Sequence, residues 1–189
     1  MVSERTYTAL ETQARRGDKT GGKCYGDRDG KIYAPEAKVI RQLFRWYVEG
    51  YSPRWMAAEL NRRQVLSPGS SWNRTARRAK VWCPSAIHGD PRRGSGILNN
   101  EIYVGRRVWN RLKWIKDPDS GKRHAILRPS SQWIVHEDAT LRLIDIETWR
   151  LSRARQTRRS AEVGDKVRKG LKRYRGQAPV HIFNGLLKC

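Results

Sequence analysis

The sequence predicts an α+β domain: a helix-turn-helix-like pair of helices, a basic loop region, a small antiparallel sheet and a closing helix. Apolar residues repeat at helical spacing in residues 35–60 and again after residue 145, whereas an alternation with a period of two begins near residue 102. Eight tryptophans and seven tyrosines indicate a folded chain, because disordered chains are poor in aromatic residues.

Residues 5–16 are polar and lack glycine, and Gly17 follows them, which favours the end of a helix at this point. Tyr7 and Leu10 are almost the only apolar residues of this segment. We therefore expect it to be the end of a longer helix that begins upstream. Residues 17–30 are rich in glycine and are predicted to be a connection.

The strongest helix prediction covers residues 35–49, with Pro35 in the first turn and Gly50 at the end. Ser52 is predicted to cap a second helix that has Pro53 at its first position. The predicted apolar positions of the two helices are Val39, Leu43, Trp46, Tyr47, Trp55, Met56, Ala58 and Leu60. Such a pair is either a DNA-recognition motif or a corner between core helices.

The following segment is less regular. Residues 72–82 place four basic side chains between two tryptophans, residues 84–89 predict one short helical turn, and residues 90–94 predict a loop. Among the tryptophans, Trp46, Trp55 and Trp149 are expected in the core. The ones more open to a surface role are Trp72, Trp82 and Trp114.

The alternation after residue 102 predicts strands. Residues 103–116 are expected to form one strand, 117–121 a turn, 122–128 the returning strand and 133–136 a third strand.

The last part of the chain begins with a predicted helix. Asp145 is expected to cap it, and the helix to run to about residue 159. Residues 160–180 are basic and poor in large apolar residues, which is typical of a linker or an arm that follows DNA.

The chain carries a strong excess of positive charge. Forty Lys and Arg residues stand against 18 Asp and Glu residues, so the formal net charge is +22. DNA or RNA would neutralise this charge. A membrane surface is the competing polyanion, but no apolar run approaches the roughly 18 residues of a spanning helix. Three cysteines are too few for a disulfide framework, which favours a reducing cytoplasm.

Ten basic residues are candidate DNA contacts, with plain solvated charge as the alternative. They are Arg74, Arg77, Arg78, Lys80, Arg92, Arg93, Arg106, Arg107, Arg111 and Lys113. The last four alternate with Val108 and Leu112, so we expect one basic and one packed face on that strand.

Catalytic chemistry is not expected within this chain. The neighbours His88–Asp90 and His136–Asp138 have residue types suited to metal or acid–base work, but such pairs arise by chance in any such chain. Cys24 and Cys83 are expected to be ordinary thiols, and no cofactor is expected.

An ordered series of motifs resembles the recombinase domain of large serine recombinases, which include phage integrases and transposon resolvases. The resemblance covers residues 5–189. Its motifs are GGKCYG (21–26), the helix pair from EAKVIRQLF to AAELN (36–61), GSGILNNEIYVGRRVWNR (94–111), KDPDSGKR (116–123), QWIVHE (132–137), LRLIDIETW (141–149) and GLLKC (185–189).

The resemblance implies a division of the chain. The implied parts are the end of an interdomain helix (1–16), a linker (17–30), the recombinase domain (31–159), a basic linker (160–180) and the start of a zinc-ribbon domain (181–189). Cys189 matches the first zinc ligand of that ribbon, but its partners are absent, so no zinc is expected. In the family a serine attacks the DNA phosphodiester, and no serine of this chain maps onto it.

We therefore expect the chain to bind double-stranded DNA at part of an attachment-site half, in the bacterial cytoplasm with the nucleoid. Strand exchange and self-association would belong to the full-length recombinase. The alternatives are a non-catalytic DNA-binding regulator or remnant and, against the resemblance, an RNA-binding protein.

Overall fold

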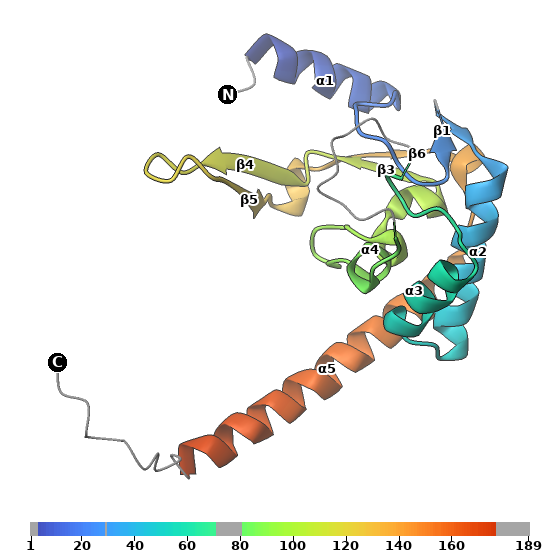
Figure 1. The fold of residues 1–189 in the computed structure, drawn as a ribbon. Helices are drawn as coiled ribbons and strands as arrows, with labels where there is room; N and C mark the ends of the chain where they lie inside the picture. Colours follow the sequence, from blue (N-terminus) through green and yellow to red (C-terminus); the bar gives the residue numbers. More distant parts are fainter. Residues whose placement is uncertain (1–3, 29, 71–80, 177–189) are drawn as a thin grey trace. The chain divides into compact units, whose positions relative to one another are not determined.

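The computed structural model describes residues 4–28, 30–70 and 81–176, with side chains through residue 165. In these ranges the chain forms five α-helices, and six strands that pair as three two-stranded antiparallel ribbons (Figure 1). The predicted α+β class is confirmed. The chain divides into two units, Met1–Ser152 and Arg153–Cys189. None of the helices in the described ranges combines the length and apolarity needed to cross a membrane.

Helices α2 (Ala34–Glu49) and α3 (Pro53–Arg62) form the predicted pair. Gly50 ends α2 at φ 116°, a left-handed conformation that glycine adopts without a steric penalty. The Ser52 hydroxyl accepts a hydrogen bond from the Trp55 backbone N–H at 3.1 Å, so it caps α3 as predicted.

The core is built around α2. Ile40, Leu43, Phe44 and Tyr47 are fully buried, and so is Met56 of α3. Their spacing places them along one side of α2, which is the pattern expected of a helix that packs through one face. Short elements close the core from the other side: α4 (Pro84–His88) and the 3-10 turns Ile97–Asn99 and Glu101–Val104.

Two tryptophans exchange their predicted environments. Trp55, predicted in the core, is 41% exposed, because its ring lies on the surface against Tyr51 at a centroid distance of 4.2 Å. Trp82, predicted to be open to a surface role, is 3% exposed. Its indole N–H donates to the Val65 carbonyl at 2.9 Å, and its ring meets the Tyr25 ring edge-on at 5.4 Å.

The other predictions for tryptophan are confirmed where the structure describes them. Trp46 is 7% exposed, and Trp149 packs against Phe44 with ring centroids 5.8 Å apart. Trp114 is 63% exposed. Trp72 lies outside the described residues.

The predicted single strand 103–116 is wrong. It is two strands, β3 (Arg106–Trp109) and β4 (Leu112–Lys116), which belong to different ribbons. The chain changes direction at Asn110, whose φ of 65° lies in the left-handed region that asparagine tolerates better than most residues. β3 pairs with β6 (Ile134–Glu137), and β4 pairs with β5 (Arg123–Leu127).

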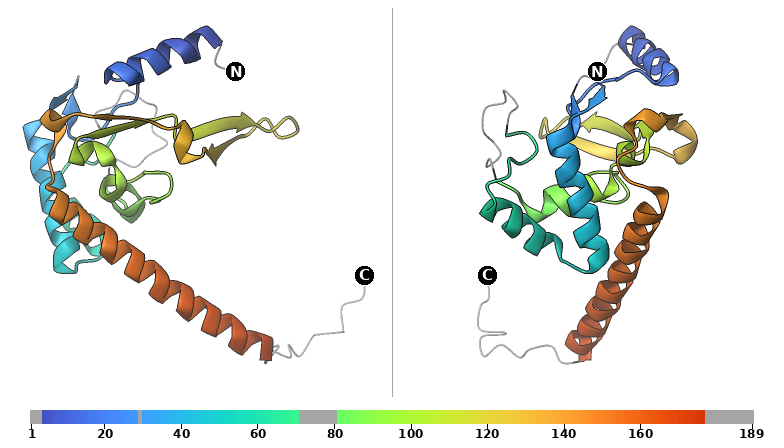
Figure 2. Two further views of the ribbon diagram at one scale, coloured as in Figure 1. Left: turned by 180° about the vertical axis from the view of Figure 1, so that it is seen from behind. Right: turned by 90° about the vertical axis from the view of Figure 1, so that its right-hand side faces the viewer.

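The β4–β5 ribbon extends away from helices α2 and α3 (Figures 1 and 2). Its strands are joined by the predicted turn, in which the Gly121 N–H donates to the Asp117 carbonyl at 2.9 Å.

The N-terminal helix and the glycine-rich connection lie against the β3–β6 ribbon. Helix α1 (Glu4–Arg16) contacts β6, and its Tyr7 ring lies 5.2 Å from the Trp109 ring. The predicted connection 17–30 is largely irregular, but it leads into a small hairpin of β1 (Asp27–Arg28) and β2 (Lys31–Ile32), which was not predicted.

The last helix, α5 (Ile146–Gly176), begins where predicted, with the Asp145 carboxylate accepting from the Thr148 N–H at 2.7 Å. The predicted end near residue 159 is wrong, because the helix continues through residues 160–176. This stretch contains no proline and is rich in Lys and Arg, which are good helix formers.

Candidate nucleic-acid interface

The ten predicted DNA contacts fall into three groups. Arg74, Arg77, Arg78 and Lys80 lie outside the described residues. Arg92 and Arg93 lie on the loop after α4, and the remaining four lie on or beside β3 and β4. The structure gives the last two groups different surroundings.

Arg92 and Arg93 are exposed at the tip of a short loop. Asp90 organises this loop: its carboxylate accepts from the Arg92 backbone N–H at 2.9 Å and lies 3.6 Å from the Arg93 guanidinium. The Arg93–Asp90 pair is half exposed on both sides, so it contributes little to stability. The guanidinium groups are therefore accessible to an anion.

The base of this loop is tightly closed. Gly89 and Gly96 approach so closely that a Cβ atom on Gly89 would lie 1.9 Å from the Ser95 carbonyl oxygen. The buried Asn99 side chain donates to the carbonyls of His88 and Ser95 and joins the two ends of the loop. The arginines are thus presented from a fixed base, which lowers the entropic cost of holding a ligand.

Arg111 and Arg106 share one carboxylate. Glu101 accepts from the Arg111 guanidinium through one oxygen, and its other oxygen lies 3.0 Å from Arg106. The Arg111 side chain is only 12% exposed and lies over the Trp133 ring at 4.5 Å. A Cβ atom on Gly94 would overlap its guanidinium, so Arg111 also supports the loop that carries Arg92 and Arg93. This arginine has a structural place in the fold.

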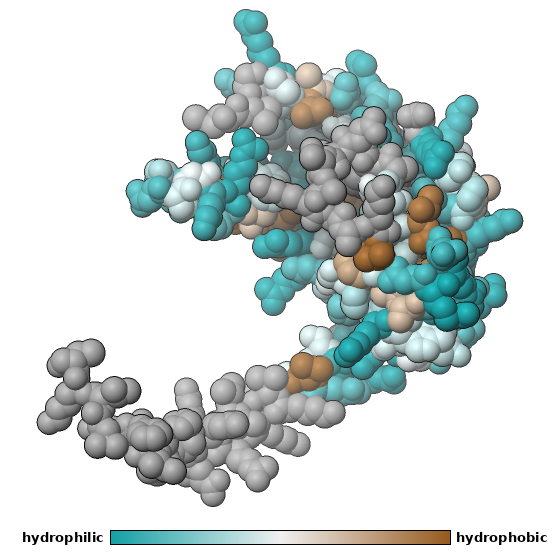
Figure 3. Space-filling view, viewed as in Figure 1, coloured by the Kyte–Doolittle hydropathy of each residue, from teal (hydrophilic) through white to brown (hydrophobic). Residues whose placement is uncertain are grey.

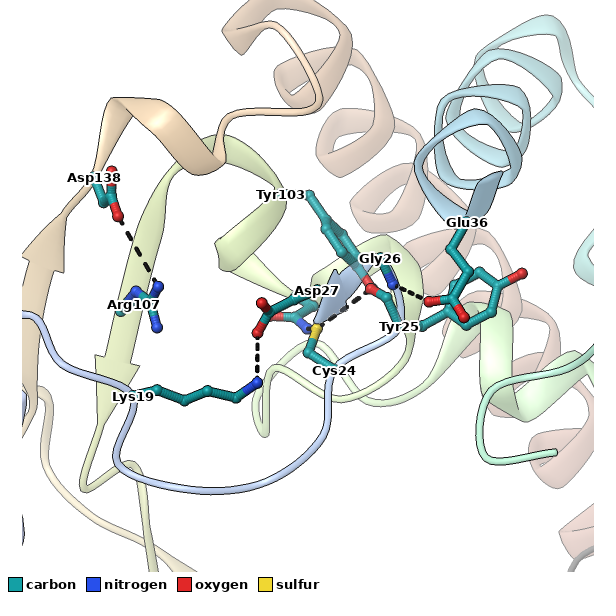
Figure 4. Close-up of polar contacts among 10 residues, drawn as sticks. Lys19, Cys24, Tyr25, Gly26, Asp27, Glu36, Tyr103, Arg107 and Asp138 are labelled. Atoms are coloured by element: carbon teal, nitrogen blue, oxygen red, sulfur yellow. Dashed lines mark hydrogen bonds and ion pairs between the residues drawn. The ribbon is translucent and has the colours of Figure 1, made fainter. Parts of the chain in front are cut away.

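Arg107 is also turned toward the protein. Its side chain is 17% exposed and its guanidinium lies 4.0 Å from the carboxylate of Asp138 (Figure 4). Asp138 in turn caps the 3-10 turn Ala139–Leu141 by accepting from the Thr140 N–H at 3.0 Å. The Thr140 hydroxyl also donates to this carboxylate, and this bond, followed by the bond from the Thr140 N–H and the charge of Arg107, holds the pKa of Asp138 below its usual value. The predicted all-basic face of one strand is therefore divided into partnered and exposed charges.

Lys113 is exposed and, within the described part of the chain, takes part in no ion pair. Three further basic residues of the same ribbon were not among the predicted contacts: Lys116, Lys122 and Arg123, all exposed. The signal that could have found them is the predicted turn 117–121, because a tight turn places the residues on its two sides opposite each other.

The connection between α1 and α2 is fixed to the domain by buried polar groups (Figure 4). Lys19 lies 2.9 Å from Asp27, whose side chain is 6% exposed, and the Gly26 N–H donates to Glu36 at 2.6 Å. The Tyr103 hydroxyl donates to the Tyr25 carbonyl at 2.9 Å. Burial raises the pKa of both Tyr103 and Cys24, which favours the neutral form of each group.

Comparison with known proteins bears on this arrangement. A family model described as Recombinase matches residues 34–159, about two thirds of the chain, from the start of α2 into α5. The chain belongs to the Recombinase family. Neither the curated proteins nor the solved structures gave a match. Family membership connects the chain with site-specific DNA recombination.

In this member of the Recombinase family the two His–acid neighbours have structural surroundings. His136 packs on Gly17 at the end of α1, so closely that a Cβ atom there would overlap the imidazole. The Asp138 carboxylate accepts from the Thr140 N–H as a cap, and the Asp90 carboxylate accepts from the Arg92 N–H within its loop. Where the structure describes side chains, no three His, Cys, Asp or Glu residues gather closely enough to hold a metal ion.

Among the described residues, the exposed cysteine is Cys83. A hydrogen-bonding contact of 3.2 Å with the Ser85 hydroxyl lowers its pKa below the usual value. Cys189 lies outside the described residues, so the predicted match to a zinc ligand stays a prediction.

Helix α3 carries a separate charged cluster. Glu59 accepts from both Arg62 and Arg63, at 2.8 and 2.7 Å, and these bonds lower the pKa of Glu59 to about 2. The two arginines are thereby held along the helix, while Arg54 in its first turn is exposed. Within the described residues, Arg54 is the basic side chain of α3 that forms no ion pair with a carboxylate.

Proposed function

We propose that the chain binds double-stranded DNA as the recombinase domain of a serine recombinase, at part of an attachment-site half. The observation that carries the proposal is the family match over residues 34–159. The net charge of +22 supports it, because duplex DNA is the polyanion on which a site-specific recombinase acts.

The distribution of partnered and exposed charge favours two contact regions. Glu101 and Asp138 partner Arg111 and Arg107 inside the domain, so these two arginines hold the fold together. The loop of Arg92 and Arg93 and the β4–β5 ribbon present basic groups to solvent. Phosphates are therefore expected to meet these exposed groups first, with Arg106, 45% exposed, between the two regions in sequence.

The other parts of the chain fit the same proposal. Residues 1–16 would be the end of a helix from a catalytic domain, residues 17–30 the linker, and residues 160–180 the connection to a zinc ribbon that starts at 181–189. Contacts of Tyr7 with Trp109 and Asn110 would then fix the direction in which α1 leaves the DNA-binding domain. Strand exchange in a synaptic tetramer would be the work of the full-length recombinase.

The test is competition between nucleic acids at equal salt. Binding of the full chain to a fluorescein-labelled 40-base-pair DNA duplex is followed by anisotropy from 50 to 400 mM NaCl, and unlabelled duplex RNA of the same length is the competitor. We expect DNA to compete better than RNA, and log K to fall linearly with log salt, by about 0.9 for each phosphate contacted. Equal or better competition by RNA would contradict the proposal, and so would undetectable DNA binding at 50 mM NaCl.

A further inference from the structure

The β4–β5 ribbon leaves large apolar side chains in solvent. Trp114 is 63% exposed, Ile126 51% and Ile115 40%, although each lies on a paired strand. A lone two-stranded hairpin is marginally stable in water, and this one buries little that would stabilise it. A ribbon that keeps such residues outside the core is well placed to use them in binding.

The register sorts the ribbon into two faces. On one face Trp114 lies opposite Ala125 and, one step nearer the turn, Lys116 lies opposite Arg123. Two like charges directly opposite each other on a strand pair are destabilising. An anion bound over Lys116 and Arg123 would offset the repulsion between them. The free end of the ribbon, at the left of Figure 3, is correspondingly hydrophilic.

The turn at this end is held by its own hydrogen bonds. The Asp117 carboxylate accepts from the Asp119 N–H at 3.1 Å and from the Ser120 hydroxyl. The Asp117 N–H donates to the Lys122 carbonyl at 2.8 Å. The bond from the Ser120 hydroxyl, followed by the bond from the Asp119 N–H, lowers the pKa of Asp117. The end of the ribbon is therefore preorganised, with one of its two carboxylates already engaged.

The base of the ribbon is anchored to the domain. The Arg128 N–H donates to the Arg111 carbonyl at 2.9 Å, and the Arg128 carbonyl accepts from the Trp133 indole N–H at 2.9 Å. Arg111 also pairs with Glu101. Arg111 therefore connects the base of the ribbon to the loop of Arg92 and Arg93, which it contacts at Gly94.

We propose that the β4–β5 ribbon enters the major groove of duplex DNA, with Lys116 and Arg123 on the phosphates that border the groove and Trp114 against the base and sugar edges. Two strands about 4.8 Å apart fit a groove about 12 Å wide. This inference rests on the proposed function and assigns it a specific element.

Charge complementarity favours DNA over an apolar protein surface. Four basic residues lie on or beside the turn and strands (Lys113, Lys116, Lys122 and Arg123) against Asp117 and Asp119. An apolar protein surface would leave these charges partly desolvated and unpaired, which costs free energy. A negatively charged groove satisfies them and still offers apolar edges to Trp114.

The test uses the full chain and the same labelled 40-base-pair duplex. The double variant Lys116→Ala/Arg123→Ala removes two proposed phosphate contacts, and Trp114→Ala removes the proposed apolar contact. The control Lys38→Ala/Arg45→Ala removes the same charge from exposed positions of α2. The swap Lys116→Arg/Arg123→Lys keeps the charge of the ribbon. Circular dichroism and thermal unfolding establish that all variants fold.

The two ribbon variants should differ in their salt dependence. Lys116→Ala/Arg123→Ala is expected to reduce the slope of log K against log salt by about 1.8. The same variant should weaken binding about tenfold or more at 0.1 M salt. The control and the swap should change the binding affinity less than about threefold. Trp114→Ala is expected to weaken binding about fivefold or more with an unchanged slope.

Distinct results would overturn the inference without touching the proposed function. If the wild type binds DNA and both ribbon variants bind as tightly, the ribbon is not in the groove. If the α2 control loses as much affinity as the ribbon variant, only the total charge matters and the assignment of the ribbon is wrong. If the wild type itself fails to bind, the proposed function fails first.

Discussion

The side of α2 that faces the core and the β4–β5 ribbon both contain regularly spaced apolar residues, and they use them in opposite ways. On α2, Ile40, Leu43 and Phe44 are fully buried. On the ribbon, Trp114 and Ile126 are more than half exposed. Burial of a large apolar side chain contributes about 1.5–3 kcal/mol, so the first set stabilises the fold and the second scarcely does.

This contrast separates the side chains that the fold needs from those that it leaves available for binding. Side chains whose truncation would unfold the domain cannot vary freely to suit a binding partner. The ribbon has a rigid turn and an anchored base, and its side chains add little to stability. Such an element suits recognition, because its contacts can be made in the complex without weakening the free protein.

The largest expected effect compares two aromatic truncations. Phe44→Ala removes a ring that lies against Tyr103 and Trp149, and it should lower the free energy of unfolding by about 3–5 kcal/mol. Trp114→Ala should change it by about 0.5 kcal/mol or less. Urea unfolding followed by circular dichroism measures both. Similar losses in the two variants would refute the contrast between core and ribbon.

A smaller effect is expected for Asn61, which joins α3 to the segment before α4. Its side chain donates to the Trp82 carbonyl at 2.9 Å and accepts from the Trp82 N–H at 2.7 Å. Asn61→Ala should cost about 2 kcal/mol in urea unfolding, since two hydrogen bonds are lost beside a buried indole. The matched control is Gln13→Ala on exposed α1, expected within about 0.5 kcal/mol. Equal costs would show that the bridge contributes nothing.

The helix cap gives the next effect. Ser52→Ala removes the acceptor for the Trp55 N–H and should lower the free energy of unfolding by about 1 kcal/mol. Ser52→Asp, which keeps an acceptor at the cap, should restore most of the loss in the same urea titration. A variant with aspartate that is no more stable than the alanine variant would argue against a capping role.

The smallest effect concerns pH. Glu59 has a pKa of about 2, lowered first by its hydrogen bonds to Arg62 and Arg63, against 4.5 for the ordinary side chain. A depressed carboxyl pKa means that its contribution to stability is complete above pH 4.5 and is lost as pH falls toward 2. An NMR titration of the Glu59 carboxyl should have its midpoint near pH 2, and Arg62→Gln should move the midpoint up. A midpoint near 4.5 in the wild type would mean that the pairs do not persist in solution.

The helix pair was predictable because its signals are local. The glycine that ends α2 and the serine that caps α3 act on backbone groups a few residues away. The order of helix pair, loop, strands and closing helix followed from the same kind of signal. Tertiary partners decided the rest: Trp82 packs into the core against Tyr25, and the Val65 carbonyl accepts from its indole N–H, neither of which a local sequence pattern indicates.

The candidate site was predictable only in part. The sequence located basic segments, but it did not show that Glu101 would hold Arg111 and Arg106 or that Asp138 would hold Arg107. These pairings depend on the change of direction at Asn110, which divides one predicted strand between two ribbons. Lys116 and Arg123 were not predicted, because which residues lie opposite each other across a turn depends on the strand register.

Backbone amide hydrogen exchange of the full chain, with and without a saturating 40-base-pair DNA duplex, would show whether the β4–β5 ribbon contacts the DNA. If DNA binds and the ribbon lies in its groove, residues 112–116 and 123–127 gain protection while the α2 amides, already protected by the core, change little. DNA binding that leaves both ribbon strands as fast to exchange as before would contradict the account.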